Sequence, residues 1–567
     1  MPDLVIGGRR SAFPRPWRAA GIAFALLGVA LVVAWFIYRR SVAYEVPEGY
    51  VTGEVVGTQA APGAAPVLTF GSSSLEWVGG ISVLRTTGES HAIGAAHGRL
   101  LGPLIAPALR ATEPSIEGTV TDEGLFGGLT HNMRLAWQWR FIDDGLTDAD
   151  RLLIAGMTRG AAASGASFAF DEMLRAQAVL DVGVPGRASG EIGRFSLAHS
   201  LTVVAQQTQA PARVWIGRTF ALSGVADGGD SAAPVVEIVT PAGKIPWASV
   251  GWPGQAGVVT GVNAQGIAVM VHPARTGDVR PTRTARPIAL LARTVLEQAK
   301  TLDEAVKLVE QTQTLGAALF VLVDGTTGTW VVVERTPSKA ILERKPKQPA
   351  FGDVLVTNAL SQDPENDRAR RMLPTGARVE RASRLVRAPL PDVAAMAAVM
   401  RDQRAPDDAP RPPGHRGVID DGRASHTIIL DPTSLELWVA DPQAAGRMRA
   451  FDLRHELRKE GDRPAPPADI AADPSAEPDR VTNLVAARAE LRAARSAMLR
   501  GDHARAAEAC ARARARAPSL PEAVELEAVI AAARGDRERA KRAYQQWLDG
   551  GADNPAGEER ARAFVNR

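Results

Sequence analysis

Hydrophobic residues change their spacing along the chain, and the changes divide it into segments. Residues 19–38 form one uncharged apolar run. That run is about as long as the 20 residues that cross roughly 30 Å of hydrocarbon as a helix. From about 88 to 185, apolar residues recur every three or four positions, which predicts helices. After residue 200, short runs rich in β-branched residues predict strands.

The strand-like runs surround one predicted helix at 285–311, and the DGTTGT segment at 324–329 predicts a hairpin turn. This order predicts an α+β domain in which helices pack against sheets. The predicted strands are LTVVA, VWIGRTFAL, PVVEIVT, GVVTGV, GIAVMV, ALFVLVD, TWVVVE, DVLVTN, HTIIL and LELWVA.

The composition and the spacing of apolar residues change again in the last part of the chain. Residues 459–480 are rich in Pro and Asp, which predicts a disordered linker. In residues 481–567, Gly501-Asp502 recurs as Gly535-Asp536, 34 positions later. This period is that of tetratricopeptide (TPR) repeats and predicts a small all-α domain of two repeats and a final helix. Cys510 is expected in its core.

Six segments follow from these patterns. Their predicted boundaries are a cytoplasmic N-terminus with a transmembrane anchor at 1–40, an extended tether at 41–68, a mainly helical segment at 69–199, a sheet-rich domain at 200–458, the linker at 459–480 and the TPR-like tail at 481–567.

Composition removes several classes of function. The 567 residues include 66 Lys and Arg against 63 Asp and Glu, and a net charge of +3 argues against a nucleic-acid partner. Cys510 is the single cysteine, so an intrachain disulfide, a cysteine zinc site and an iron–sulfur cluster are excluded. The nine histidines lack metal-ligand spacing, and no dinucleotide or phosphate-loop motif occurs. We therefore expect no metal and no cofactor.

Arginines flank the apolar run unequally. Four precede it and two follow directly, which predicts a cytoplasmic N-terminus and places residues 41–567 outside the cytoplasmic membrane of a bacterial-type cell. A cleaved signal peptide is the competing interpretation, but the run exceeds an ordinary signal core and no small-x-small site follows. The arginines are Arg9, Arg10, Arg15 and Arg18 before the run, and Arg39 and Arg40 after it.

Ser200 is the candidate nucleophile. It follows His199 and begins an apolar run that leads to Gly217-Arg218. The simplest interpretation is an interior strand that begins with Ser. In N-terminal-nucleophile (Ntn) enzymes, however, self-cleavage frees the α-amine of a Ser, Thr or Cys, and that amine acts as the base for the side chain. Residues 69–199 would then be the segment that is cut from Ser200.

Residues 77–453 resemble the choloylglycine-hydrolase-like and acyl-coenzyme A:6-aminopenicillanic-acid-acyltransferase-like Ntn hydrolases, which include acid ceramidase. The resemblance implies an αββα sandwich. It rests on the order of several segments, namely ESHAIGAAHGRLLG, the run from Ser200 to Gly217-Arg218, TGVNAQGIAV, LVTNAL, ERASRLVRA and SHTIILDPTSLELWVAD.

The resemblance also implies the roles of five residues. Ser200 takes the nucleophile position, Asn263 and Asn358 are expected to stabilise the oxyanion, and Arg218 and Arg384 are expected to orient the amine or a substrate charge. Other roles are open, because Asn263 also fits a turn, Asn358 a strand-end cap and Arg384 a solvated helix face.

The sequence departs from the family pattern at three positions. Ser200 replaces the family Cys, Thr219 replaces an Asn, and Ala221 replaces the Asp that holds the amine. Asp227 or Asp230 could substitute for that Asp.

Two functions follow from this sequence. The first is a membrane-anchored amidohydrolase or acyltransferase that acts on a small molecule with a linear amide, after self-cleavage between His199 and Ser200. The alternative is a non-catalytic Ntn-fold scaffold that binds envelope proteins through its TPR-like tail.

Overall fold

The computed structural model describes most of the chain. The described residues are 15–59, 65–117, 133, 137, 140–181, 199–210, 213–222, 233–276, 285–344, 354–367, 374–444, 446–459, 467–473 and 479–567.

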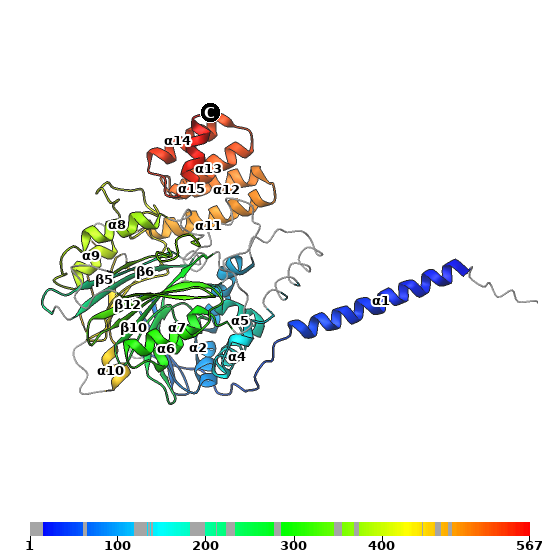
Figure 1. The fold of residues 1–567 in the computed structure, drawn as a ribbon, viewed down its shortest axis with the longest axis horizontal. Coiled ribbons are helices and arrows are strands. Elements are labelled where there is room, and N and C mark those ends of the chain that lie inside the picture. The colour runs from blue at the N-terminus through cyan, green and yellow to red at the C-terminus, as the bar shows by residue number, and fades with distance from the viewer. Residues whose placement is uncertain are drawn as a thin grey trace, which may run out of the picture.

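The N-terminal helix α1 (Arg15–Val42) projects away from the rest of the molecule (Figure 1). Its segment Ile22–Val42 is long and apolar enough to cross a membrane, and none of the most apolar window is buried. The predicted tether at 41–68 is partly wrong, because two short strands lie in or begin in it. β1 (Val56–Thr58) pairs with β2 (Val67–Phe70), and both join the larger sheet.

The larger sheet has the strand order β1-β2-β3-β4-β7-β8-β9-β10-β11-β12-β13. Its neighbours pair antiparallel except β4 and β7, which run parallel. The remaining strands are β3 (Ser73–Val78), β4 (Ile81–Gly88), β7 (Val235–Pro241), β8 (Trp247–Gly251), β9 (Thr260–Asn263), β10 (Ile267–Ala274), β11 (Ala317–Asp324), β12 (Thr329–Arg335) and β13 (Ala340–Arg344).

The smaller sheet has the order β14-β5-β6-β15-β16-β17, and all its neighbours are antiparallel. Its strands are β5 (His199–Gln206), β6 (Val214–Ala221), β14 (Val354–Val356), β15 (His426–Asp431), β16 (Glu436–Ala440) and β17 (Met448–Asp452), and the short helix α10 (Leu453–Arg458) follows β17.

The two sheets pack face to face, because one apolar cluster contains residues of both, among them Val236 and Met270 from the larger sheet and Ile216 and Ile428 from the smaller. Helices cover the outer faces of both sheets, as the clusters of α6 with β10 and of α9 with β6 and β15 show. The domain is therefore the expected α+β sandwich with αββα layers. The covering helices are α2 (Ser90–Glu117), the 3-10 turn η1 (Ile142–Gly145), α4 (Asp148–Ala163), α5 (Phe170–Gln177), α6 (Ile288–Gln298) and α7 (Leu302–Gln311) on the larger sheet, with α8 (Thr375–Leu385) and α9 (Val393–Met400) on the smaller.

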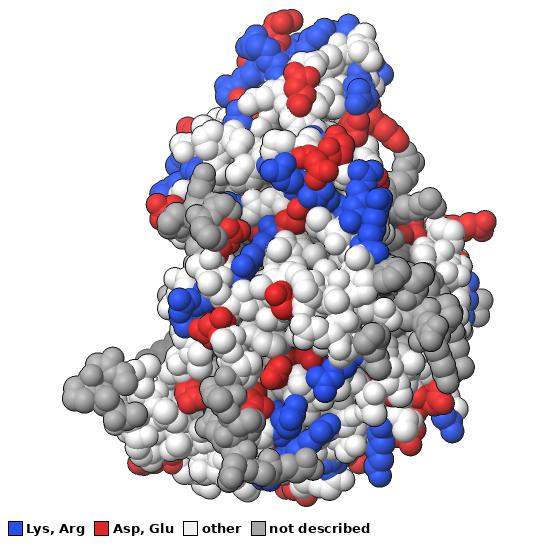
Figure 2. Space-filling model, turned by 90° about the vertical axis from the view of Figure 1, so that its left-hand side faces the viewer, with Lys and Arg blue, Asp and Glu red and all other residues white. Residues whose placement is uncertain are grey.

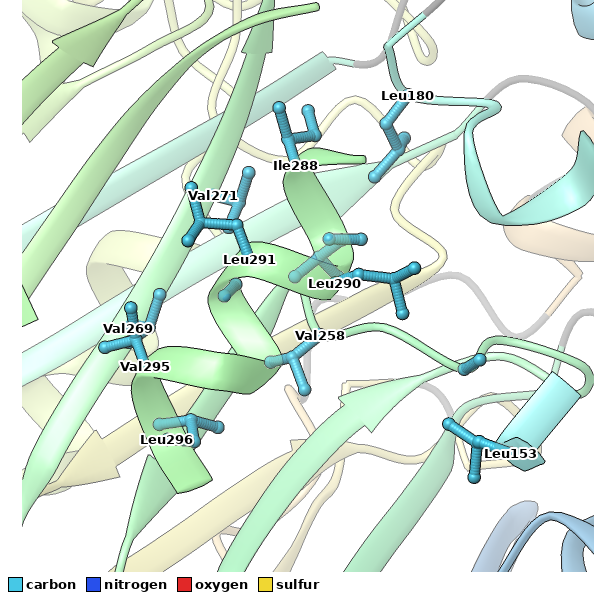
Figure 3. Packing of buried hydrophobic residues seen from close by; sticks show 14 of the residues in the cluster. Leu153, Leu180, Val258, Val269, Val271, Ile288, Leu290, Leu291, Val295 and Leu296 are labelled. Carbon is cyan, nitrogen blue, oxygen red and sulfur yellow. The ribbon is translucent and has the colours of Figure 1, made fainter. Parts of the chain in front are cut away.

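Helix α6 illustrates how the outer layer packs. Its Leu291 and Val295 lie against Val269 and Val271 of β10 (Figure 3). The sequence predicted one helix over 285–311, but the structure has two, α6 and α7. Thr301 separates them, since its side chain accepts a hydrogen bond from the Glu304 backbone and begins the second helix.

The C-terminal tail contains five helices, and it packs beyond α8 at one end of the sandwich (Figure 1). Asp502 and Asp536 cap α12 and α14 in the same way, each accepting a hydrogen bond from the residue three positions on. The 34-residue recurrence is therefore a repeated helix start. The helices are α11 (Arg480–Leu499), α12 (His503–Arg516), α13 (Pro521–Ala533), α14 (Arg537–Asp549) and α15 (Pro555–Val565).

The predicted linker at 459–480 is not wholly free of structure. Ile470 forms an isolated bridge with Met448 and is buried in the cluster on the outer face of the smaller sheet. Cys510 is buried in the tail, as expected.

Candidate active site

Ser200 is the second residue of β5 and is completely buried between the two sheets. Side chains point alternately to the two faces along β5, which explains where the Ser200 side chain points. Leu201 and Val203 belong to the outer cluster under α8 and α9, so Ser200 and Thr202 point inward to the larger sheet. The Ser200 backbone N–H donates to Asn358 Oδ1 at 2.7 Å, and Oγ lies 2.8 Å from Nδ1 of His272 and 3.2 Å from Asn358 Oδ1.

Asn358 follows β14 and turns its carbonyl oxygen, not its amide nitrogen, toward Ser200. Its Nδ2 donates to the Pro273 carbonyl at 2.8 Å, which accepts only, so the amide orientation is fixed. Asn358 therefore lies near the nucleophile, as expected, but it presents a hydrogen-bond acceptor where an oxyanion would need a donor. Asn358 accepts hydrogen bonds from Ser200.

Arg218 of β6 reaches the other side of the same cluster. Its NH1 donates to Thr202 Oγ1 at 3.1 Å and lies 3.1 Å from Nε2 of His272, and NH2 donates to the Val271 carbonyl. Thr202 Oγ1 lies 2.7 Å from the same Nε2. The imidazole of His272 is thus held from both ring nitrogens.

Arg378 of α8 approaches from the smaller sheet. Its NH1 donates to the Ser200 carbonyl at 3.4 Å, and NH2 donates to Thr219 Oγ1 at 3.2 Å. Thr219, which stands where the resemblance implies an Asn, therefore anchors this guanidinium.

The site is electropositive. Burial lowers the pKa of Arg218 to about 9 and that of Arg378 to about 10, so both stay charged at neutral pH. Within the described residues neither guanidinium forms an ion pair. Burial, and then the two guanidiniums, hold the pKa of His272 well below its usual value, so its ring is neutral.

Two expected site residues lie elsewhere. Both Nδ2 protons of Asn263 are used by the Leu296 and Ala299 carbonyls, and its Oδ1 accepts from the backbone of the following turn. Arg384 is partly exposed on α8 and pairs with Glu380. The oxyanion role of Asn263 and the orienting role of Arg384 are corrected accordingly, since the structure gives the first a turn and the second a solvated helix face.

Residues 235–409 match the family model described as Acyl-coenzyme A:6-aminopenicillanic acid acyl-transferase. Over these residues the chain is similar to that acyltransferase family. The match includes His272, Asn358 and Arg378, whereas Ser200 and Arg218 lie on the two strands that precede it.

Three solved structures are also similar to the chain. An N-acylethanolamine-hydrolyzing acid amidase orthologue from Caenorhabditis elegans is 15% identical, with a TM-score of 0.31, over 41% of this chain and 93% of its own. Two variants of the conjugated bile acid hydrolase from Clostridium perfringens are 10% and 12% identical, each with a TM-score of 0.28, over 46% of this chain and 93% of their own. No curated protein matches the sequence.

Ala221 stands where the resemblance implies an Asp, and the structure shows which carboxylate lies near its cross-strand partner. Ala221 is the cross-strand partner of His199. Asp421, from the segment before β15, lies with Oδ2 3.2 Å from His199 Nδ1. Burial raises the pKa of Asp421, but Arg423 and His199 outweigh that effect and hold it well below its usual range. Asp227 and Asp230 lie outside the described residues.

Sequence reasoning missed His272, Thr202, Arg378 and Asp421. His272 had one visible sign, since a polar residue at an inward position of an otherwise apolar strand requires a buried partner. Arg378 lies on the same helix as the chosen Arg384, fewer than two turns before it, and only the packing of α8 distinguishes them.

Proposed function

We propose that this chain is a membrane-anchored Ntn-type amidohydrolase or acyltransferase with Ser200 as its nucleophile. The observation that carries the proposal is the set of contacts at Ser200. Its nitrogen and its hydroxyl share Asn358 Oδ1, the buried Arg378 guanidinium donates to its carbonyl, and the buried Arg218 guanidinium contacts the His272 ring that touches its hydroxyl. Positive charge in a water-excluded site is suited to stabilise the anionic transition state of acyl transfer.

The first step we propose is self-cleavage between His199 and Ser200. Ser200 Oγ attacks the His199 carbonyl carbon, the C–N bond breaks, and the hydroxyl proton ends on the Ser200 nitrogen. Water then hydrolyses the resulting ester, which leaves a carboxylate on His199 and restores the hydroxyl. Complete burial of Ser200 is no obstacle, because the scissile carbonyl is covalently adjacent to it.

Turnover repeats this chemistry on a small acylated substrate. The free α-amine takes the proton as Oγ attacks the amide carbonyl, and returns it to the leaving amine. Water, or a second amine, then removes the acyl group from Oγ. Neither step uses a metal or a cofactor.

Anchoring and topology belong to the same proposal. The exposed apolar face of α1 supports a single membrane span, and the flanking arginines support placement of residues 41–567 outside the cytoplasmic membrane of a bacterial-type cell. Reporter fusions after residue 60 test the orientation. A reporter that is active only in the cytoplasm would overturn it.

The deciding experiment compares the full-length wild type with Ser200→Ala and Ser200→Cys. We expect the wild type to give two chains, the second beginning Ser-Leu-Thr-Val-Val by N-terminal sequencing. Ser200→Ala should remain a single chain of about the full 60.0 kDa, whereas Ser200→Cys should be processed, because a thiolate can perform the same acyl shift. A wild type that folds but remains uncut contradicts the proposal.

One observation favours the scaffold as a second candidate. The TPR-like tail has a pocket of about 450 Å³ between α12, α13 and α14, lined by Cys510, Arg514, Glu527 and Arg539 among others. A protein partner bound there would fit a non-catalytic role. An uncut chain that hydrolyses no N-acyl amide or acyl thioester, yet captures an envelope protein through its tail, would support this alternative.

A further inference from the structure

The hydrogen bonds around His272 define which of its nitrogens carries the proton. Nε2 lies 3.1 Å from NH1 of Arg218 and 2.7 Å from the Thr202 hydroxyl. A guanidinium has donors and no acceptor, so a proton on Nε2 would face another donor in a fully buried site. If Nε2 is unprotonated, Arg218 NH1 and the Thr202 hydroxyl can both donate to it, and no two donors face each other.

The donors around Nε2 favour the tautomer with the proton on Nδ1. Nδ1 is 2.8 Å from Ser200 Oγ, so in this tautomer it donates to that oxygen. The hydroxyl proton must then point away from His272. Among the contacts of Oγ in the described structure, the acceptor on the other side is Asn358 Oδ1 at 3.2 Å, which also accepts the Ser200 N–H at 2.7 Å.

We propose that His272 is a positioning residue for Ser200 and not its general base: through Nδ1–H it holds Oγ and turns the hydroxyl proton toward Asn358 Oδ1, the oxygen that also accepts the N–H of the Ser200 nitrogen. The inference rests on the proposed function, because that nitrogen receives the proton when the peptide bond breaks and acts as the base afterwards. The competing role, a Ser–His pair in which Nδ1 accepts the proton, requires the opposite tautomer.

The charges that face the ring support the neutral donor form. Arg218 faces it from β6, Arg378 lies on α8, and burial and both cations lower its pKa, so an imidazolium, which a base would become, is disfavoured there. A second buried histidine, His426 of β15, is likewise held well below its usual pKa by burial and Arg218.

The direct test is the tautomer. In full-length protein carrying 15N-labelled histidine rings, the two-bond couplings between ring nitrogens and ring protons tell Nδ1–H from Nε2–H. The chain has nine histidines, so the His272 signals are assigned as those absent from His272→Asn. We expect a proton on Nδ1. A proton on Nε2 overturns the inference, whether or not the chain cleaves itself.

Variants supply the second arm. In His272→Asn the amide nitrogen can take the place of Nδ1 and donate to Oγ, but it cannot accept a proton. We expect self-cleavage and turnover within about tenfold of wild type for His272→Asn, and a loss on the order of 100-fold for His272→Leu, which has no donor. Equal losses in both variants, or none in His272→Leu, contradict the inference. A wild type that neither cleaves itself nor turns over substrate, yet carries the proton on Nδ1, would contradict the proposed function and leave the inference about His272 standing.

Discussion

At the residue scale, two arginines of α8 differ in whether they take part in the site. Arg378 is buried against Ser200, whereas Arg384 is partly exposed and paired with Glu380. We predict that Arg378→Gln slows self-cleavage on the order of 100-fold, because it removes a buried positive charge that donates to the Ser200 carbonyl, next to the scissile bond. Arg384→Gln should stay within about twofold, since an exposed pair contributes little. The rate of appearance of the second chain on gels measures both, and a slower Arg384→Gln would restore the role that the sequence suggested.

The same contrast explains what the sequence could predict about the site. Ser200, Arg218 and Asn358 follow from motif order, because each occurs on or beside a strand whose position the pattern defines. Asn263 occupies an equally good motif position, but its amide serves the carbonyls at the end of α6, which lie far from it in sequence. Motif position identifies a residue, while hydrogen-bond partners assign its role.

Element-scale packing depends on close contact between α2 and α4. A Cβ added to Gly160 would lie 2.3 Å from the Ala95 carbonyl oxygen and 2.8 Å from the Arg99 nitrogen, both backbone atoms that cannot turn aside. We predict that Gly160→Ala lowers the free energy of unfolding by about 1–3 kcal/mol, because the helices must separate. Thermal unfolding followed by circular dichroism measures the change.

Gly376 provides the matched control. It lies in α8, and a Cβ there would meet nothing within 4 Å. Because Ala favours helix more than Gly by roughly 1 kcal/mol, Gly376→Ala should leave the unfolding temperature unchanged or raise it slightly. If both variants were equally stable, the close approach of α2 and α4 would not exist in solution.

Most helices and strands can be predicted from the sequence, and each error in that prediction has a local cause. The β-branched runs became strands because their apolar residues have partners on both faces of each sheet. The predicted single helix at 285–311 ends early because Thr301 caps a second one. The short strands β1 and β2 have no strong apolar pattern, and their pairing depends on the sheet edge provided by β3. Such tertiary partners are invisible to local periodicity.

On the scale of the whole molecule, the segment before Ser200 is an integral part of the sandwich. β4 pairs in parallel with the whole length of β7, and α2 and α4 fill the core on the outer face of the larger sheet. We therefore predict that self-cleavage leaves residues 1–199 bound to the rest of the chain. The two chains should coelute on size exclusion in native buffer and separate only in denaturant. Spontaneous loss of the smaller chain would contradict this arrangement.

The tail is joined to the site by buried charges. Arg416 pairs with Asp553 at 2.9 Å, Arg423 with Glu522 at 3.0 Å, and Arg423 in turn lies 3.4 Å from Asp421, which contacts His199. Charges of both signs are also interspersed over the surface shown in Figure 2. The tail thus provides the opposite charges for Arg416 and Arg423, which lie in the same segment as Asp421, the residue that contacts His199 at the scissile bond.

Glu522 offers the sharpest test of this connection. It lies within ion-pair distance of Arg423, Arg488 and Arg495, so Glu522→Gln removes a carboxylate that these buried cations share and should lower the free energy of unfolding by about 3–5 kcal/mol at pH 7. Glu558→Gln, which removes an exposed pair with Arg562, should change it by less than about 1 kcal/mol.

The pH dependence of that difference has a definite sign. Burial raises the pKa of Glu522, but Arg423, Arg495 and Arg488 outweigh it and hold the pKa well below the ordinary 4.5. The unfolded chain then binds the proton first as pH falls, so the stability that Glu522 provides is complete above about pH 5.5 and declines below 4.5. Urea unfolding at pH 7, 5 and 3.5 should therefore show wild type and Glu522→Gln converging toward acid. A gap that stays constant across this range would mean that Glu522 acts through packing and not through its charge.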